Sequence, residues 1–68
     1  MNTDVLKGQW KQFEGRVRQK WGKLTDDDVA RINGDRDVLA GRIQERYGRV
    51  REDVMNEIDS WVVGESAR

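Results

Sequence analysis

The fold is decided by residues 10–28, WKQFEGRVRQKWGKLTDDD, which join a stripe of apolar side chains to a turn and a helix-capping sequence. The apolar side chains recur at spacings of three or four residues. They are Leu6, Trp10, Phe13, Val17 and Trp21. At about 100° per residue they fall within a stripe about 60° wide. The pattern predicts a long amphipathic helix that ends at Gly22.

The end of this stretch is typical of a helix start. Thr25 can accept a hydrogen bond from a backbone N–H of the following turn, and the aspartates at 26–28 suit the positive end of a helix dipole. Val29 and Ile32 then face inward, and Asn33-Gly34 is a typical helix stop. Successive helical residues point about 100° apart, so three adjacent carboxylates cannot converge on one ion, and we predict no metal site there.

The chain contains an internal repeat with an offset of 26 residues. Residues 8–29 align with residues 34–55, and the alignment matches three glycines in each half as well as the apolar positions. The alternative is that two amphipathic helices merely look alike. The repeat predicts a single helical domain with halves at about 4–33 and 34–62 and a frayed tail at 63–68.

The second half predicts two further helices. Asp35 is expected to cap the third helix, and Gly48 to end it. Arg51 stands where Thr25 stands in the first half, so the fourth helix lacks an evident polar cap, which is usually worth about 1 kcal/mol. We expect the start of that helix to be less sharply defined.

The fold class is therefore all-α, with four short helices as two helical hairpins packed across each other. Helices this short must cross steeply to cover one compact core. The residues expected to carry the fold are Trp10, Phe13, Val17, Trp21, Leu24, Ile32, Leu39, Ile43, Tyr47, Ile58 and Trp61.

The composition argues against catalysis. The 68 residues include no histidine and no cysteine, and serine occurs only at positions 60 and 66. Without a nucleophile and a base to activate it, we expect no enzyme, no catalytic residue, no cofactor and no metal. The absence of cysteine favours a reducing compartment, and the sequence shows no signal peptide and no long apolar run. We therefore expect a cytoplasmic protein that does not insert into a membrane.

Several short motifs resemble the CsbD-like proteins of bacteria. They are MNTD at 1–4, WKQ at 10–12, WGKLTDDD at 21–28 and QERYG at 44–48. The resemblance covers nearly the whole chain and implies a small helical protein of the general stress response, whose biochemical activity is not established. It supplies no catalytic residue. The chain departs from the family pattern at 49–51 and in the tail at 62–68, which affects the expected end of the fourth helix.

Basic residues gather in the first helix although the net charge is zero. Between positions 7 and 23 there are six basic residues and one acid. Lys7, Lys11 and Arg18 share one side of the helix, and we call them the basic flank, a candidate surface for an anion or a partner. Glu14 lies inside this flank and is expected to pair with Lys11 and Arg18. Because nucleic-acid modules are usually clearly basic, nucleic-acid binding is not the favoured interpretation.

The mid-helix glycines Gly15 and Gly41 are the least expected feature, since alanine would be better by about 1 kcal/mol at each. They could keep the helices marginal in a hydrated protective protein, or allow a close contact with a partner or a second copy. A repeat inherited without such a role is favoured over both. The sequence thus predicts a non-enzymatic stress-response protein, a hydrophilic protective or interaction module. The alternative is a small adaptor that binds nucleic acid or a partner protein through the basic flank.

Overall fold

The computed structural model describes residues 3–66, and that range contains five α-helices and no β-strand. The helices are α1 (Thr3–Gly8), α2 (Trp10–Lys20), α3 (Asp26–Ile32), α4 (Arg36–Tyr47) and α5 (Arg51–Ser66). The all-α class is confirmed. No helix in the described part of the chain combines the length and the apolar character that a membrane span requires.

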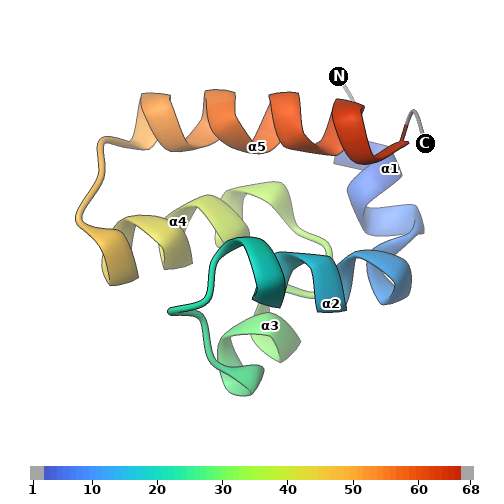
Figure 1. Ribbon diagram of the computed structural model, residues 1–68, viewed down its shortest axis with the longest axis horizontal. Coiled ribbons are helices and arrows are strands. Elements are labelled where there is room, and N and C mark those ends of the chain that lie inside the picture. The colour runs from blue at the N-terminus through green and yellow to red at the C-terminus, as the bar shows by residue number, and fades with distance from the viewer. Residues whose placement is uncertain (1–2, 67–68) are drawn as a thin grey trace.

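The first expected helix is divided in two at Gln9. This residue has φ −119° and ψ 28°, outside the helical region, so α1 turns away from the axis of α2 (Figure 1). Hydrogen bonding continues through the bend, because the Gln9 N–H donates to the Val5 carbonyl at 3.0 Å and the Gln9 carbonyl accepts from Phe13 at 3.1 Å. Leu6, in α1, and Trp10, in α2, are both buried on the inner side of this bend.

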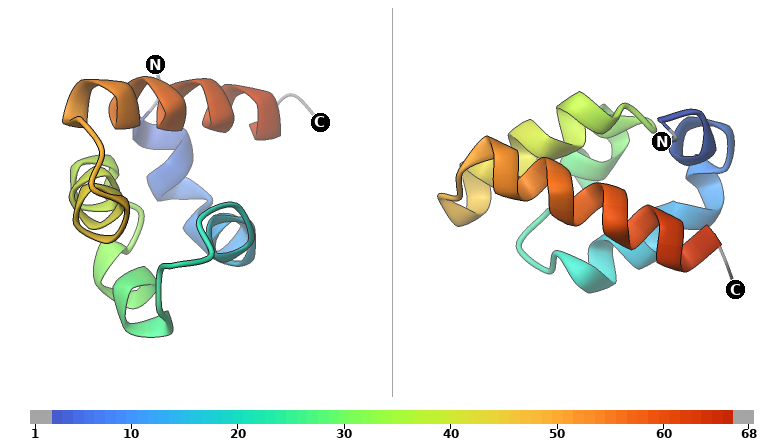
Figure 2. Two further views of the ribbon diagram at one scale, coloured as in Figure 1. Left: turned by 60° about the vertical axis from the view of Figure 1, so that its left-hand side comes forward. Right: turned by 90° about the horizontal axis from the view of Figure 1, so that it is seen from above.

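Four helices surround the core. The left-hand view of Figure 2 shows α2 and α4 on opposite sides, with α5 above them and α3 below. The right-hand view shows α4 and α5 diverging from their shared turn, so this hairpin crosses at a wide angle (Figure 2). The axes of α2 and α5 lie further apart, and no Cα atom of α2 comes within 8 Å of one in α5. Aromatic side chains bridge these two helices, since the Trp61 ring of α5 packs against Phe13 of α2.

The core is apolar and draws on all five helices. Its buried members are Leu6, Trp10, Phe13, Val17, Trp21, Leu24, Val29, Ile32, Leu39, Ala40, Ile43, Val54, Ile58 and Val62. Of the residues expected to carry the fold, Tyr47 and Trp61 are partly buried and pack against this core, and the others are buried. The burial of Ala40 was not expected, because a small side chain adds little to an apolar sequence pattern. Ala40 is buried because its neighbours pack closely around α4.

Three of the expected helix boundaries are confirmed by their local geometry. Thr25 caps α3 by accepting from the backbone of Asp28, and Asp35 caps α4 by accepting from the backbone N–H of Asp37 and Val38. Gly48 ends α4 in the left-handed conformation, with φ 66°. Each of these devices needs only residues within one turn of the helix end, and this explains why the sequence reveals them.

Two other boundaries have a different or weaker basis. α2 ends at Lys20, and Trp21 is its C-cap, with φ −116° and its N–H bonded to the Val17 carbonyl at 2.8 Å. The C-cap therefore lies one residue before the expected stop at Gly22, and Gly22 does not adopt the left-handed conformation that a glycine stop uses. Val50 precedes α5 and offers no side-chain oxygen as a cap, in line with the missing polar cap noted in the sequence. α5 then continues to Ser66, through most of the segment expected as a tail.

Gly34 joins α3 to α4 and lies directly against the bend between α1 and α2. It has φ +82°, and a Cβ at this position would stand 2.8 Å from the Lys7 Cα and 3.3 Å from the Trp10 Cβ. Neither the backbone conformation nor the space admits a side chain. By contrast, nothing lies within 4 Å of a Cβ built on Gly15 or Gly41, so packing requires neither of these two glycines.

Gly34→Ala should therefore lower the free energy of unfolding by about 2 kcal/mol or more, because it adds both a strained φ and a clash with backbone. Gly15→Ala is the matched control, and it should raise the free energy of unfolding by about 0.5–1 kcal/mol because it improves helix propensity in open space. Urea unfolding followed by tryptophan fluorescence measures both. Wild-type stability in Gly34→Ala would contradict the close approach of the two segments.

Candidate functional site

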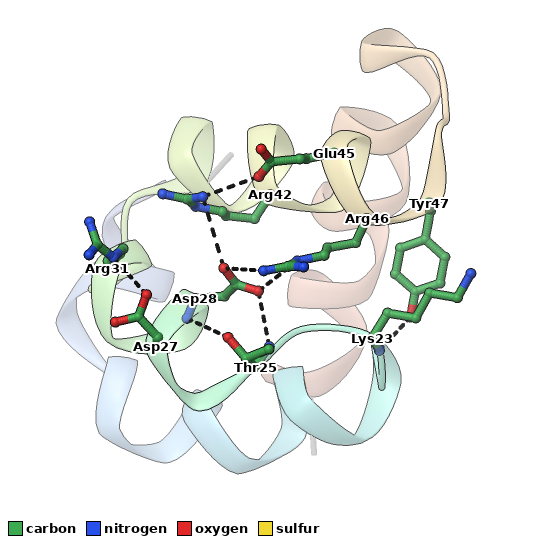
Figure 3. A network of polar contacts seen from close by, with 9 residues as sticks. All are labelled: Lys23, Thr25, Asp27, Asp28, Arg31, Arg42, Glu45, Arg46 and Tyr47. Carbon is green, nitrogen blue, oxygen red and sulfur yellow. Dashed lines mark hydrogen bonds and ion pairs between the residues drawn. The ribbon is translucent and has the colours of Figure 1, made fainter.

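Asp28, in the first turn of α3, is the centre of a polar network that links α3 to α4 (Figure 3). Its side chain is only 2% exposed. Arg46 donates to it from α4 through Nε to Oδ2 at 2.9 Å and through Nη2 to Oδ1 at 3.2 Å. The Thr25 backbone N–H also donates to Oδ2, at 3.0 Å, while the Asp28 N–H donates to Thr25 Oγ1 at 3.1 Å. The helix cap and the inter-helix ion pair thus share one carboxylate.

These contacts hold Asp28 in its ionised form. The hydrogen bonds from Arg46 and from the Thr25 backbone lower the pKa of Asp28 from its usual 3.8 to about 2, against the effect of burial, which alone would raise it. The same pairing raises the pKa of Arg46. Arg42 adds a second positive charge at 3.9 Å from Asp28 and is itself bonded to Glu45 at 3.1 Å. The network is therefore an arrangement of fixed charges at neutral pH.

The three consecutive aspartates are paired with three different arginines. Asp26 accepts from Arg18 of α2, Asp27 accepts from Arg31 one turn later in α3 at 2.8 Å, and Asp28 accepts from Arg46 of α4. The carboxylates therefore diverge. Within residues 3–66, no group of three or more potential ligands is placed to hold a metal ion.

Sequence reasoning missed the burial of Asp28. It treated the three aspartates alike, as a charged helix start, which fits Asp26 and Asp27, whose side chains are 94% and 72% exposed. The signal that could have found it is the spacing of Thr25 and Asp28, since a reciprocal cap turns the carboxyl back toward the preceding turn. No sequence pattern indicated Arg46 as the partner.

The basic flank is divided by the bend at Gln9. Lys7 lies on α1, whereas Lys11 and Arg18 lie on α2. Arg18 donates to Asp26 across the α2–α3 turn, and among the described side chains neither Lys11 nor Arg18 forms the expected ion pair with Glu14. Lys7 and Lys11 are exposed and have no ion-pair partner among the side chains that the structure describes.

Arginines are used differently from lysines. All arginines in the described part of the chain form ion pairs, and several of these link two helices. They are Arg16, Arg18, Arg31, Arg36, Arg42, Arg46, Arg49 and Arg51. The clearest case is the half-buried pair in which Arg36 donates to Asp59 of α5 through two bonds of 2.6 and 2.7 Å. Lys23 instead places its Nζ 5.0 Å from the centre of the Tyr47 ring. Most of the charge on this surface is therefore compensated within the fold.

Comparisons with known proteins give a consistent family. The family described as CsbD-like matches residues 4–55. Over 61 residues the chain is 56% identical to the UPF0337 protein YjbJ of Escherichia coli O6:H1, which covers 90% of this chain and 88% of the relative. It is 54% identical to the UPF0337 protein ECA0631 of Pectobacterium atrosepticum, with the same coverage. It is 47% identical over 58 residues to the UPF0337 protein PA4738 of Pseudomonas aeruginosa, covering 85% of this chain and 89% of the relative. No solved structure matches the chain significantly.

The lowered pKa of Asp28 predicts a specific acid dependence of stability. Because the folded pKa of about 2 lies below the usual 3.8, the unfolded chain binds the proton first as the pH falls. The contribution of Asp28 to the free energy of unfolding is then complete above about pH 4 and is lost between about pH 4 and pH 2.

The measurement is urea unfolding at a series of pH values between about 2 and 7. Asp28→Asn should lower the free energy of unfolding at pH 7 by about 1–3 kcal/mol and flatten its dependence below pH 4. Asp27→Asn, at the exposed neighbouring position, should leave the acid dependence nearly unchanged. Parallel pH profiles for wild type and Asp28→Asn would contradict the assigned network.

Proposed function

The chain belongs to the CsbD-like family, and we propose that it acts as a non-enzymatic stress-response protein, a hydrophilic module that protects other macromolecules. The observation that carries this proposal is the internal compensation of its charge. Charged residues make up 38% of the chain, the net charge is zero, and all the arginines in the described range are ion-paired. Such a surface stays strongly hydrated without a large field that would attract a particular charged partner.

The exposed surface supports the same proposal. Among the described residues, the large apolar side chains that are exposed are Val50, directly before α5, and Val63, near its end. Single exposed apolar residues are ordinary on soluble proteins, whereas interfaces usually show a contiguous patch. The protein would thus remain dispersed at high concentration. Protection that works by keeping other macromolecules apart requires this property. The cysteine-free composition suits action in the cytoplasm.

The chemistry of the polar network argues against an enzyme. A general acid or base works best with a pKa near the operating pH, whereas the pKa of the buried Asp28 is about 2. Its oxygens are already bonded to Arg46 and Thr25. The chain contains no histidine or cysteine to supply another base or a thiolate.

A second candidate function is an adaptor that binds nucleic acid through the basic flank. It is favoured by Lys7 and Lys11, whose charges have no partner among the described side chains. It is weakened by Arg18, whose guanidinium is engaged by Asp26, and by the net charge of zero.

Protection is tested by repeated freezing and thawing of a sensitive oligomeric enzyme, with residual activity and light scattering as readouts. We expect the protein to preserve several-fold more activity than an inert globular protein at equal mass concentration. A variant with Asn56→Leu and Ser60→Leu adds apolar surface to the outer side of α5 and should lose the effect, because both positions are exposed. Asn56→Gln with Ser60→Thr is the matched polar control. Equal protection by all proteins tested would contradict the proposal.

Binding to mixed-sequence duplex DNA separates the two candidates, with fluorescence anisotropy as the measurement. We expect no binding at about 50 mM salt, because few uncompensated cations are available. The adaptor function requires affinity that falls steeply with salt and disappears when Lys7, Lys11 and Arg18 are all changed to alanine. The double variant Lys7→Ala with Lys11→Ala is the control that leaves the ion pair of Arg18 with Asp26 intact.

A further inference from the structure

A groove of about 450 Å³ runs between α2 and α5, lined by Arg16, Gln19, Lys20, Trp61 and Glu65. It exists because these two helices keep their backbones apart and meet only through long side chains. None of the residues in this groove takes part in the network around Asp28.

The two walls of the groove carry opposite charges. Arg16 and Lys20 stand one turn apart on α2, and Glu57 and Glu65 stand two turns apart on α5. An ion pair crosses the groove at either end: Arg16 Nη1 lies 3.4 Å from Glu65 Oε1, and Lys20 Nζ lies 3.4 Å from Glu57 Oε2. Trp61 is midway between the two glutamates in the sequence of α5, so its indole lies between the two ion pairs.

The aromatic base of the groove is held in place by the core. The Trp61 ring meets Phe13 with centroids 5.5 Å apart at 64°, and Trp21 with centroids 4.9 Å apart at 74°, both edge-to-face arrangements. Trp61 is only partly buried, so part of the indole remains open to the groove. A cation already lies near this cluster, since Lys20 Nζ is 5.4 Å from the Trp21 ring centroid. An aromatic ring between two carboxylates is a favourable environment for an ammonium group.

We propose that this groove binds a small zwitterion, with its ammonium group against Trp61 and Glu65 and its carboxylate against Arg16. A simple cation would meet the positive wall of α2, and a simple anion would meet the negative wall of α5. A molecule with both charges complements both walls. When the zwitterion separates Arg16 from Glu65, its carboxylate takes the place of Glu65 at Arg16. Its ammonium group takes the place of Arg16 at Glu65.

Binding requires an exchange of partners at the Arg16–Glu65 ion pair. The side chain of Arg16 is 48% exposed and can turn toward the ligand, whereas that of Glu65 is only 15% exposed, so the ammonium group must replace Arg16 at a largely buried carboxylate. If Lys20 turns away, Glu57 keeps its ion pair with Arg49. The site is therefore shallow and adaptable, and we expect a dissociation constant on the order of 1–10 mM. This inference is independent of the proposed protective function.

The test uses glycine betaine as the probe, with NMR detection of the three indole N–H groups of Trp10, Trp21 and Trp61. We expect a saturable shift centred on Trp61, with a smaller shift at Trp21, whose ring contacts Trp61, and none at Trp10. Tetramethylammonium represents the cationic half of the probe and acetate the anionic half. Each should bind about tenfold more weakly than glycine betaine. Sucrose controls for general solvent effects and should give no saturable shift.

Two charge-removing variants test the assigned walls. Arg16→Gln and Glu65→Gln should each raise the dissociation constant about three- to tenfold, whereas Arg31→Gln, which removes an ion pair on α3, should leave it unchanged. A shift that grows linearly and equally at all three indoles would overturn the proposal. Binding of tetramethylammonium alone as tightly as the betaine would overturn it as well, and that measurement needs no variant.

Discussion

The paired hydrogen bonds from Arg46 to Asp28 are the constraint on which the arrangement of the helices depends. Removing a carboxylate from water is costly, and the cost is offset here by two guanidinium bonds and the Thr25 backbone N–H. The same oxygens fix the first turn of α3 and attach it to α4. Replacing Arg46 would leave the buried carboxylate of Asp28 without its main partner, and replacing Asp28 would remove both the bond to the Thr25 backbone and the link to α4.

What the sequence predicts correctly is local in origin. The caps at Thr25 and Asp35 and the stop at Gly48 each depend on residues within one helical turn, and the apolar stripe of α2 depends only on helical periodicity. The bend at Gln9 has no such local signal. It coincides with the approach of Gly34, which is 25 positions away along the chain and therefore invisible to any short pattern.

The candidate basic flank shows the same limit for charges. Helical spacing places Arg18 beside Glu14, but the turn that follows α2 brings Asp26 to Arg18, and the inter-helix pair forms in place of the local one. Arginine suits such pairs because its planar fork binds a carboxylate with two parallel bonds, as Arg36 does with Asp59. In a protein with a small core, these links specify which helices meet more than they add to stability.

The position of Gly34 shows that the two segments aligned in the predicted repeat are not equivalent in the fold. In the repeat alignment Gly34 corresponds to Gly8, and its backbone presses on Lys7, immediately beside that counterpart. Gly8 itself faces open space. Equivalent positions of the two aligned segments therefore carry unequal steric constraints, tight at Gly34 and absent at Gly8. Each segment thus depends on the other for packing that it does not provide by itself.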